Sequence, residues 1–186
     1  MIGFLAFLAV IGLLRVIELV ISKKNWRRHQ DKASLLEEPL FRWMVLLHAS
    51  FFVLIPAELF INGGSFGSAV SIVGMVMTGL ALLLRFWTLR TIGSSWNVRV
   101  VYAEDYPIVH HGPYRFIRHP NYLVVILELA FIPLIYELYI SAILLSLLNA
   151  MVLNRRISNE EAVLFKNPQW VAHMADKPRF FPFLSK

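Results

Sequence analysis

Long apolar runs constrain the fold of this chain more than any other feature of its sequence. Three of them cover Met1 to Ile21, Met44 to Ile61 and Ser68 to Leu89. With a helical rise of about 1.5 Å per residue, runs of this length can cross a hydrocarbon core of about 30 Å. We therefore predict three membrane-spanning helices. The first is expected to be retained, because it lacks the basic start of a signal peptide.

A fourth apolar run, Tyr122 to Leu153, is too long for a single crossing. As one helix its 32 residues would extend about 48 Å, and Pro133, Tyr136 and Glu137 interrupt its middle. We expect a helical hairpin instead, with two arms of about 16 residues that each cover only about 24 Å.

The positions of the basic residues favour the hairpin. Lys and Arg together number six in residues 22–43, four in 90–120 and six in 154–186, whereas residues 62–67 and 133–139 contain none. Short cytoplasmic loops of membrane proteins are enriched in Lys and Arg, so the three basic segments belong on the cytoplasmic side. The sequence predicts an all-α polytopic membrane protein with five transmembrane helices, its N-terminus outside and its C-terminus cytoplasmic.

The composition is consistent with a chain that lies largely in lipid. It is 58% hydrophobic and 16% charged, against about 45–50% and about 25% in soluble domains. The net charge of +6 follows from topology and from attraction to anionic membrane lipids, so no nucleic-acid partner is expected. The absence of cysteine excludes disulfides, thiolate metal sites and cysteine nucleophiles. We expect one membrane domain over 1–186, with three helices in 1–90 and a catalytic half in 91–186.

Two predicted cytoplasmic segments contain the residues that can carry chemistry. Residues 96–122 and 154–165 flank the hairpin, so its folding brings them together on one face of the membrane. In the first segment, His119 is followed by Pro120, which is well placed to begin a helix whose N-terminus attracts a carboxylate or phosphate. In the second, Arg156 and Glu160 are four residues apart and share a helical face, from which they could hold a zwitterionic cofactor.

Simpler interpretations of these residues stay open. Proline is common at helix starts, and basic clusters beside crossings often only fix topology. Arg156 and Glu160 could also form an exposed ion pair. No metal site is expected, because the adjacent His110 and His111 point apart on an extended segment and no third ligand has suitable spacing. The remaining histidines that we expect to be packing or surface residues are His29, His48 and His173.

Charged residues inside the apolar runs need partners or water, because an ionisable group at membrane depth is costly. Arg15 and Glu18 are three apart and can satisfy one another. Arg85 lies near the inner end of its run, where a long side chain can reach the membrane surface. Glu128 lies six residues after Tyr122 and has two open interpretations: it lines a substrate cavity, or it pairs with Arg85 or a hydroxyl.

The motifs of the two segments resemble a known family. In chain order they are Gly-Pro-Tyr-Arg at 112–115, Arg-His-Pro-x-Tyr at 118–122, Arg156-x-x-x-Glu160-Glu161-x-x-Leu164, and Pro-Arg-Phe-Phe-Pro at 178–182. Their order around a hairpin is similar to that of the isoprenylcysteine carboxyl methyltransferase family of integral-membrane enzymes, which use S-adenosyl-L-methionine. The resemblance implies that Arg156 faces the methyl acceptor. It also implies a cofactor site formed by Tyr106, Pro107, Ile108, Val109, Tyr114, His119, Pro120, Asn121, Tyr122 and Glu160.

One departure from the family pattern concerns the acceptor. Family members that act on prenylated cysteine usually have glycine two residues after the motif tyrosine, where this chain has Val124. Together with the sequence Trp-x-Val-Arg at 96–99 and with Glu128, this looks more like a bacterial branch that methylates hydroxyls of long-chain polyketides such as alkylpyrones and alkylresorcinols. The resemblance therefore implies methyl transfer to a hydroxyl or carboxyl oxygen of a lipophilic acceptor. Arg156 or Arg99 would stabilise that oxygen, and Glu128 is a further candidate for acceptor binding.

Two other functions stay open. A membrane reductase resembling sterol reductases would share the His-Pro-Asn-Tyr sequence of 119–122 and would use NADPH, although such chains commonly continue with Gly-Glu. A non-catalytic membrane scaffold would keep the motifs for folding alone and would bind no cofactor. S-adenosyl-L-methionine binding separates the methyltransferase prediction from both.

Overall fold

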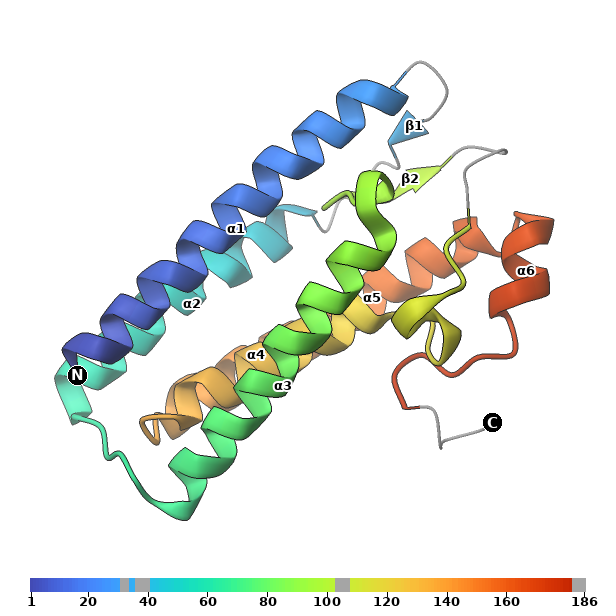
Figure 1. Cartoon of the computed structure of the whole chain (residues 1–186). Helices are drawn as coiled ribbons and strands as arrows, with labels where there is room; N and C mark the ends of the chain where they lie inside the picture. The colour runs from blue at the N-terminus through green and yellow to red at the C-terminus, as the bar shows by residue number, and fades with distance from the viewer. Residues whose placement is uncertain (31–33, 36–40, 103–107, 182–186) are drawn as a thin grey trace.

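Five long helices form the body of the molecule (Figure 1). The computed structural model describes residues 1–30, 34–35, 41–102 and 108–181. The long helices are α1 (Ile2–His29), α2 (Phe41–Asn62), α3 (Ala69–Ile92), α4 (Pro120–Leu134) and α5 (Tyr139–Leu164). The short elements are the 3-10 turns η1 (Gly93–Ser95) and η2 (Gly112–Arg115), the helix α6 (Pro168–Met174), and an antiparallel pairing of β1 (Ser34–Leu35) with β2 (Val101–Tyr102). Apart from that two-residue pairing, the described fold is all-α, as predicted.

Four of the five long helices are long and apolar enough to cross a membrane: α1, α2, α3 and α5. The fourth, α4, is apolar but has only 15 residues, which gives it a length of about 22 Å. Five crossings and the orientation of the termini therefore stay predictions. The predicted length of about 16 residues for each arm is wrong for α5, which has 26 residues. The helix is longer because the polar stretch from Asn154 to Leu164 continues it beyond the apolar run.

Small residues allow α3 to pack closely against α4. The buried positions of α3 follow a spacing of three and four residues: Ser71, Gly74, Thr78, Ala81, Arg85 and Thr88. Small side chains at such a seam let helix backbones approach, which is how helices commonly associate in lipid. Gly74 marks a close approach to the end of α4, because a Cβ there would lie 2.8 Å from the backbone nitrogen of Ile135. Of the residues in this seam, only Arg85 is charged.

The carboxylate of Glu58 joins α2 to α5. Glu58, near the end of α2, accepts hydrogen bonds from the backbone N–H groups of Ile140 (3.1 Å) and Ser141 (2.6 Å). These N–H groups belong to the first turn of α5, where they have no partner within the helix and where the helix dipole favours a negative charge. The turn between α4 and α5 contains Glu137 at a φ of 56°. Both contacts fix the start of α5.

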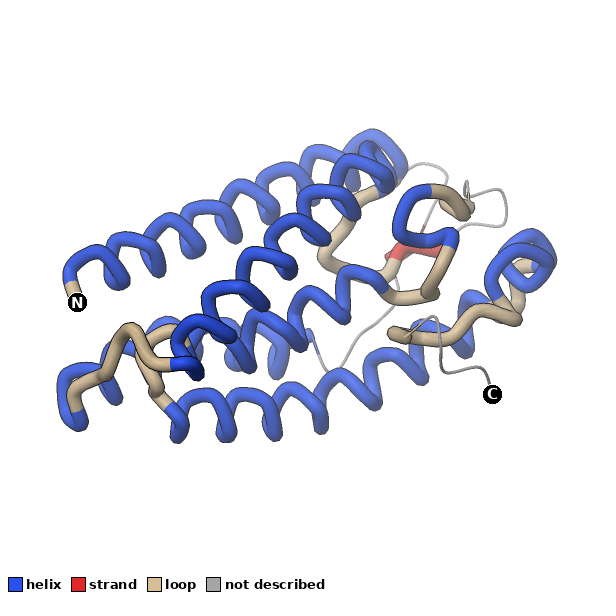
Figure 2. Tube along the Cα trace, turned by 60° about the horizontal axis from the view of Figure 1, so that its bottom comes forward, coloured by secondary structure: helices blue, strands red, loops and turns tan. Residues whose placement is uncertain are grey.

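The two ends of the bundle differ in character. At the end near the N-terminus, a hydrophobic core joins α1, α2, α4 and α5 around Phe4, Phe51, Ile55 and Ile132. At the opposite end lie η2, α6, the β1–β2 pairing and the C-terminal segment, as Figure 1 and Figure 2 both show. The motif-bearing segments belong to this second end.

Candidate active site

A cavity of about 670 Å³ opens among the helices at the end that carries the short elements. Its volume lies within the range of about 300–1,000 Å³ that is usual for small-molecule sites. All five long helices, α6 and the connections between them contribute to its lining. The cavity therefore depends on segments that are far apart in the sequence.

Most of the predicted site residues line this cavity together. They are Arg99, Ile108, Val109, Tyr114, His119, Asn121, Tyr122, Arg156 and Glu160. Pro120 begins α4, as expected, but is absent from the cavity lining of the described residues. Tyr106 and Pro107 lie outside the described residues.

Tyr122 contacts two cavity-lining residues of α5. Its hydroxyl donates a hydrogen bond to the carboxylate of Glu160. The guanidinium of Arg156 lies over its ring, 5.6 Å from the ring centre, a distance at which a cation is attracted to an aromatic face. Arg156 and Glu160 are thus held apart on one side of the cavity by an aromatic residue of α4.

Arg156 also connects α5 to α2 and to the segment before β2. Its side chain donates a hydrogen bond of 2.6 Å to the backbone oxygen of Val98 and contacts the sulfur of Met44. Only 6% of the residue is exposed. The guanidinium of Arg99 lies 5.5 Å from the ring centre of Phe41, at the start of α2. Two guanidinium groups are therefore held in place beside α2.

The polar end of α1 positions the segment that carries Arg99. The backbone N–H of Val98 donates to the hydroxyl of Ser22 (3.0 Å), and the amide of Asn25 donates to the backbone oxygen of Trp96 (2.9 Å). Ser22 and Asn25 are buried. Trp96 is buried as well and lines the cavity, and its indole N–H has no hydrogen-bond partner among the described residues.

The C-terminal segment covers the start of α4. The backbone N–H groups of Arg118 and His119 donate to the backbone oxygens of Pro178 (3.0 Å) and Arg179 (3.1 Å). Glu161 completes this junction, since it accepts from His119 Nε2 at 3.0 Å and pairs with Arg118 and Arg179. The chain itself therefore satisfies the two N–H groups that directly precede Pro120. The expectation that the start of α4 holds an anion stays a prediction for the N–H groups of its first turn.

Tyr114 is fixed from both sides of η2. Lys177 Nζ donates a hydrogen bond of 2.7 Å to its backbone oxygen. Burial, and next the charge of Glu160, raise the pKa of the Tyr114 phenol, so its hydroxyl stays protonated at neutral pH. Burial also lowers the pKa of the Lys177 ammonium. Gly112, at a φ of 57°, lets η2 approach α3, because a Cβ there would lie 2.4 Å from the Thr91 hydroxyl.

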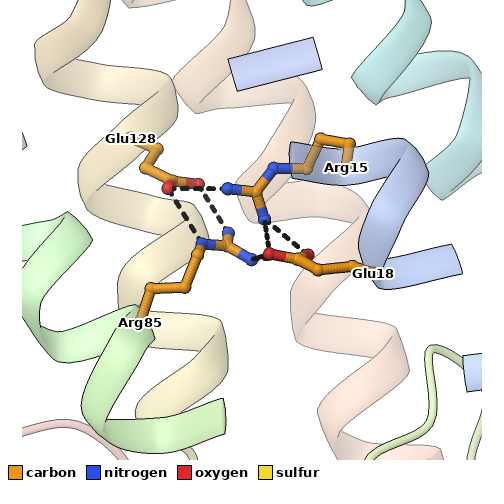
Figure 3. Close-up of polar contacts among 4 residues, drawn as sticks. All are labelled: Arg15, Glu18, Arg85 and Glu128. Carbon is orange, nitrogen blue, oxygen red and sulfur yellow. Dashed lines mark hydrogen bonds and ion pairs between the residues drawn. The ribbon is translucent and has the colours of Figure 1, made fainter. Parts of the chain in front are cut away.

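Four charged residues form a buried cluster at the inner side of the cavity (Figure 3). Arg85 pairs with Glu18 (2.9 Å) and Glu128 (2.6 Å), and Arg15 pairs with the same two carboxylates (2.7 and 3.1 Å). The expected Arg15–Glu18 pair is present. The expectation that Arg85 reaches the membrane surface is wrong, because its seam position directs the side chain between α1 and α4, where 5% of the residue is exposed.

Glu128 takes the second of its two predicted roles, the pairing with Arg85. The other three members of the cluster line the cavity, but Glu128 is absent from the lining among the described residues. Eight residues separate it from Pro120 at the start of α4, which places the cluster about 12 Å into the bundle. A role of Glu128 in binding the acceptor stays a prediction.

His48 is one of the cavity residues that sequence reasoning missed. We expected a packing or surface residue, but His48 lines the cavity. It shares a face of α2 with Phe41, Met44 and Phe52, which also line the cavity at spacings of three and four residues. This helical periodicity was a usable signal, but only once the direction of that face was known.

Comparison with known proteins identifies the family. Residues 72–166, just over half of the chain, match the model of the isoprenylcysteine carboxyl methyltransferase (ICMT) family. The chain belongs to the ICMT family. This membership implies a methyltransferase, and the four long apolar helices of the ICMT-family chain make it an integral membrane protein. The predicted family is thereby confirmed.

Two kinds of relative show how far the likeness extends. The chain is 29% identical over 163 residues to the uncharacterized protein YpbQ of Bacillus subtilis (strain 168), which covers 87% of this chain and 96% of YpbQ. It is 36% identical over 55 residues to a probable protein-S-isoprenylcysteine O-methyltransferase of Oryza sativa, in both the indica and the japonica subspecies. That second match covers 28% of this chain and 29% of the rice protein.

Proposed function

We propose that this protein binds S-adenosyl-L-methionine and transfers a methyl group to an oxygen of a lipophilic acceptor, at the cytoplasmic face of a bacterial cell membrane. The observation that carries the proposal is that one cavity is lined both by the motif residues and by the charged residues inside the bundle. This cavity contains Tyr114 and Glu160 from the motif segments and continues to the charged cluster at Arg85 within the helix bundle. A water-soluble cofactor and a lipid-soluble acceptor could meet in such a cavity.

The polar groups of the cavity match those of the cofactor. S-adenosyl-L-methionine carries a sulfonium, an ammonium, a carboxylate and an adenine ring. Glu160 supplies a carboxylate for a cationic group. Asn121 has a buried side-chain oxygen without a partner among the described residues, which could accept from an amino group, and Trp96 has the unpaired indole donor. Buried polar atoms rarely lack partners, so these two support a polar ligand.

The acceptor has a separate route into the cavity. Val16 and Leu19 of α1 and Val45 of α2 line the cavity, yet they are 56%, 51% and 52% exposed. Residues that line the cavity and are also exposed at the surface indicate a lateral opening between α1 and α2 toward the lipid. Its apolar rim suits a long hydrocarbon or prenyl chain. The proposed acceptor is therefore a lipophilic alcohol, phenol or carboxylic acid, such as a long-chain polyketide or a prenylated cysteine.

The protein contributes alignment and charge to the proposed reaction. Bound S-adenosyl-L-methionine supplies an electrophilic methyl group on a positively charged sulfur. Arg156 and Arg99 would stabilise the acceptor oxygen as an anion and keep it nucleophilic. The buried cavity would exclude water from the reacting atoms. No covalent enzyme intermediate is needed.

The first test is binding. In detergent, S-adenosylhomocysteine is expected to raise the melting temperature of the protein, whereas NADPH is not. The substitution Glu160→Gln should weaken this stabilisation, because it removes the carboxylate while keeping the shape. Stabilisation by NADPH alone would favour a reductase, and stabilisation by neither ligand would favour a scaffold.

The second test is transfer. Membranes incubated with methyl-labelled S-adenosylmethionine should yield a lipid that gains one methyl group, detected by mass spectrometry. Arg156→Ala is expected to reduce this transfer about 100-fold or more, in line with the loss of one charge-stabilising donor. Arg155→Ala is the matched control, because Arg155 is the exposed neighbour on α5. Full activity of a folded Arg156→Ala protein would overturn the assigned site.

A further inference from the structure

His48 lines the cavity, and one nitrogen of its imidazole ring is already hydrogen-bonded within the protein. Its Nδ1 lies 2.8 Å from the backbone oxygen of Met44, one helical turn earlier. A carbonyl oxygen only accepts hydrogen bonds, so Nδ1 carries the hydrogen. The neutral ring then has its lone pair on Nε2. Among the hydrogen bonds of the described residues, Nε2 of His48 takes part in none.

Two carboxylates of the described cavity lining are paired within the protein. Glu160 accepts from the Tyr122 hydroxyl, and Glu18 is paired with both Arg15 and Arg85. His119 donates from Nε2 to the carboxylate of Glu161, so its accepting nitrogen is Nδ1, just as the accepting nitrogen of His48 is Nε2. The two histidines differ in position, because His119 is joined to the C-terminal segment through its backbone N–H, whereas His48 lies on α2. His48 is therefore the histidine suited to take up a proton from a ligand that lies beside α2.

The position of His48 also matches the route proposed for the acceptor. It lies on α2, one turn from Val45 at the lateral opening and one turn from Met44, which contacts Arg156. An acceptor oxygen that enters between α1 and α2 and approaches Arg156 would pass this side of α2. His48 is thus placed between the lipid side of the cavity and the guanidinium of Arg156.

Charged residues of α1, α4 and α5 act on the ring. Arg15 and Arg156 repel a positive charge on His48, and Glu128 attracts it. The other charged groups that line the cavity among the described residues are Glu18, Arg85, Arg99, Arg118 and Glu160. Both cations also stabilise an acceptor oxygen that has lost its proton. They therefore favour loss of the proton from the acceptor and, because they repel an imidazolium, its onward release from the ring.

We infer that Nε2 of His48 accepts the proton of a hydroxyl acceptor during methyl transfer. This inference rests on the proposed function. The hydroxyl O–H bond breaks and its proton moves to Nε2, while an oxygen electron pair forms the new bond to the methyl carbon. The carbon–sulfur bond breaks and its electron pair stays on the sulfur. The imidazolium then releases its proton to water at the mouth of the cavity. A carboxylate acceptor brings no proton and would not need His48.

The first experiment needs no turnover. A 4-nitrophenol with a long alkyl chain is titrated in detergent with the full-length protein, and its ionisation is read from nitrophenolate absorbance. The substitution His48→Asn keeps an N–H donor for the Met44 carbonyl but cannot take up a proton. We expect it to raise the apparent pKa of the bound nitrophenol by about one unit, a tenfold loss of ionisation. His173→Asn is the matched control: His173 Nδ1 bonds to a backbone oxygen four residues earlier, but the residue is exposed.

The second experiment compares acceptors of different acidity. With a long-chain alkylresorcinol, His48→Asn should lower kcat by about 100-fold or more, as expected for the loss of a general base. With the long-chain nitrophenol, which ionises without help at neutral pH, the loss should be under tenfold. A merely structural role would lower both rates equally.

The outcomes separate the two proposals. If S-adenosylhomocysteine does not stabilise the wild-type protein and no acceptor is methylated, the proposed function fails. If the wild-type protein methylates the alkylresorcinol and a folded His48→Asn protein does so equally well, only the role of His48 fails. Unchanged stabilisation of His48→Asn by S-adenosylhomocysteine shows that the variant is folded. Equal losses with both acceptors would also overturn the inference.

Discussion

At the scale of single residues, the cluster of Arg15, Glu18, Arg85 and Glu128 shows how four charges are kept inside the bundle. Each guanidinium contacts both carboxylates, so no member depends on one partner. Taking ions out of water is expensive, and removing one partner from a buried pair commonly costs about 3–5 kcal/mol, because a charge is left uncompensated. The cluster is thus tolerated as a complete set.

A balanced deletion is therefore expected to do less harm than a single one. Glu128→Gln should lower the free energy of unfolding by about 3–5 kcal/mol, because it leaves two cations with one carboxylate. Adding Arg15→Gln should restore part of this loss, since Arg85 and Glu18 then remain as a neutral pair at 2.9 Å. Melting of the purified proteins in detergent measures both effects. An additive result would contradict the four-residue cluster.

Single residues also mark what the sequence could and could not predict. The motif residues Tyr122, Arg156 and Glu160 line one cavity, as expected from their local spacing and from the predicted hairpin. The burial of Arg85 was not predictable, since a charge near a helix end fits the membrane surface equally well. Its seam position becomes informative only when α4 is known to cover that face. The direction of His48 depends in the same way on the placement of α2.

At the scale of elements, the starts of two helices follow local sequence rules, whereas the end of α5 does not. Pro120 begins α4, as the proline rule suggested, and Ser68 caps α3, where its side chain accepts from the Ser71 N–H. The length of α5 was misjudged, because a polar stretch can continue a helix beyond lipid with no change in local preference. The covering of the α4 start by residues 178–179 depends on a long-range contact that no local pattern encodes.

The contact between α3 and α4 gives a matched pair of substitutions on one helix. Gly74→Ala should destabilise the protein by about 1–3 kcal/mol, because the added Cβ would overlap the backbone of residues 134–135. Gly79→Ala should be neutral or slightly stabilising, since nothing lies within 4 Å of a Cβ there. Thermal unfolding in detergent separates the two. Equal melting temperatures would show that the helices are not in such close contact.

At the scale of the whole molecule, the proposed function assigns two entrances to one cavity. The short elements surround the end where Tyr114 and Glu160 lie, and exposed apolar residues of α1 and α2 line the cavity on the side of the proposed lateral opening. Proposed roles follow this division, with a polar ligand at the first entrance and a long-chain acceptor at the second. In this division, the hydrophobic core at the opposite end of the bundle has only a structural role.

Blocking the lateral opening should affect one ligand only. Val45→Trp is expected to raise KM for a long-chain acceptor by about tenfold, on the scale of a few lost methylene contacts, and to leave stabilisation by S-adenosylhomocysteine unchanged. Val53→Trp is the control: Val53 is 65% exposed on the same helix and lies outside the cavity lining of the described residues. If both variants behave alike, acceptors do not enter between α1 and α2.

The charged cluster has a consequence for the behaviour of the protein in a living membrane. A transmembrane voltage acts on a group in proportion to its net charge, at about 2.3 kcal/mol per elementary charge and 100 mV. Two arginines and two glutamates held together carry no net charge. The field of an energised membrane therefore exerts no net force on the cluster, and the bundle around it is expected to keep the same form when the membrane is depolarised.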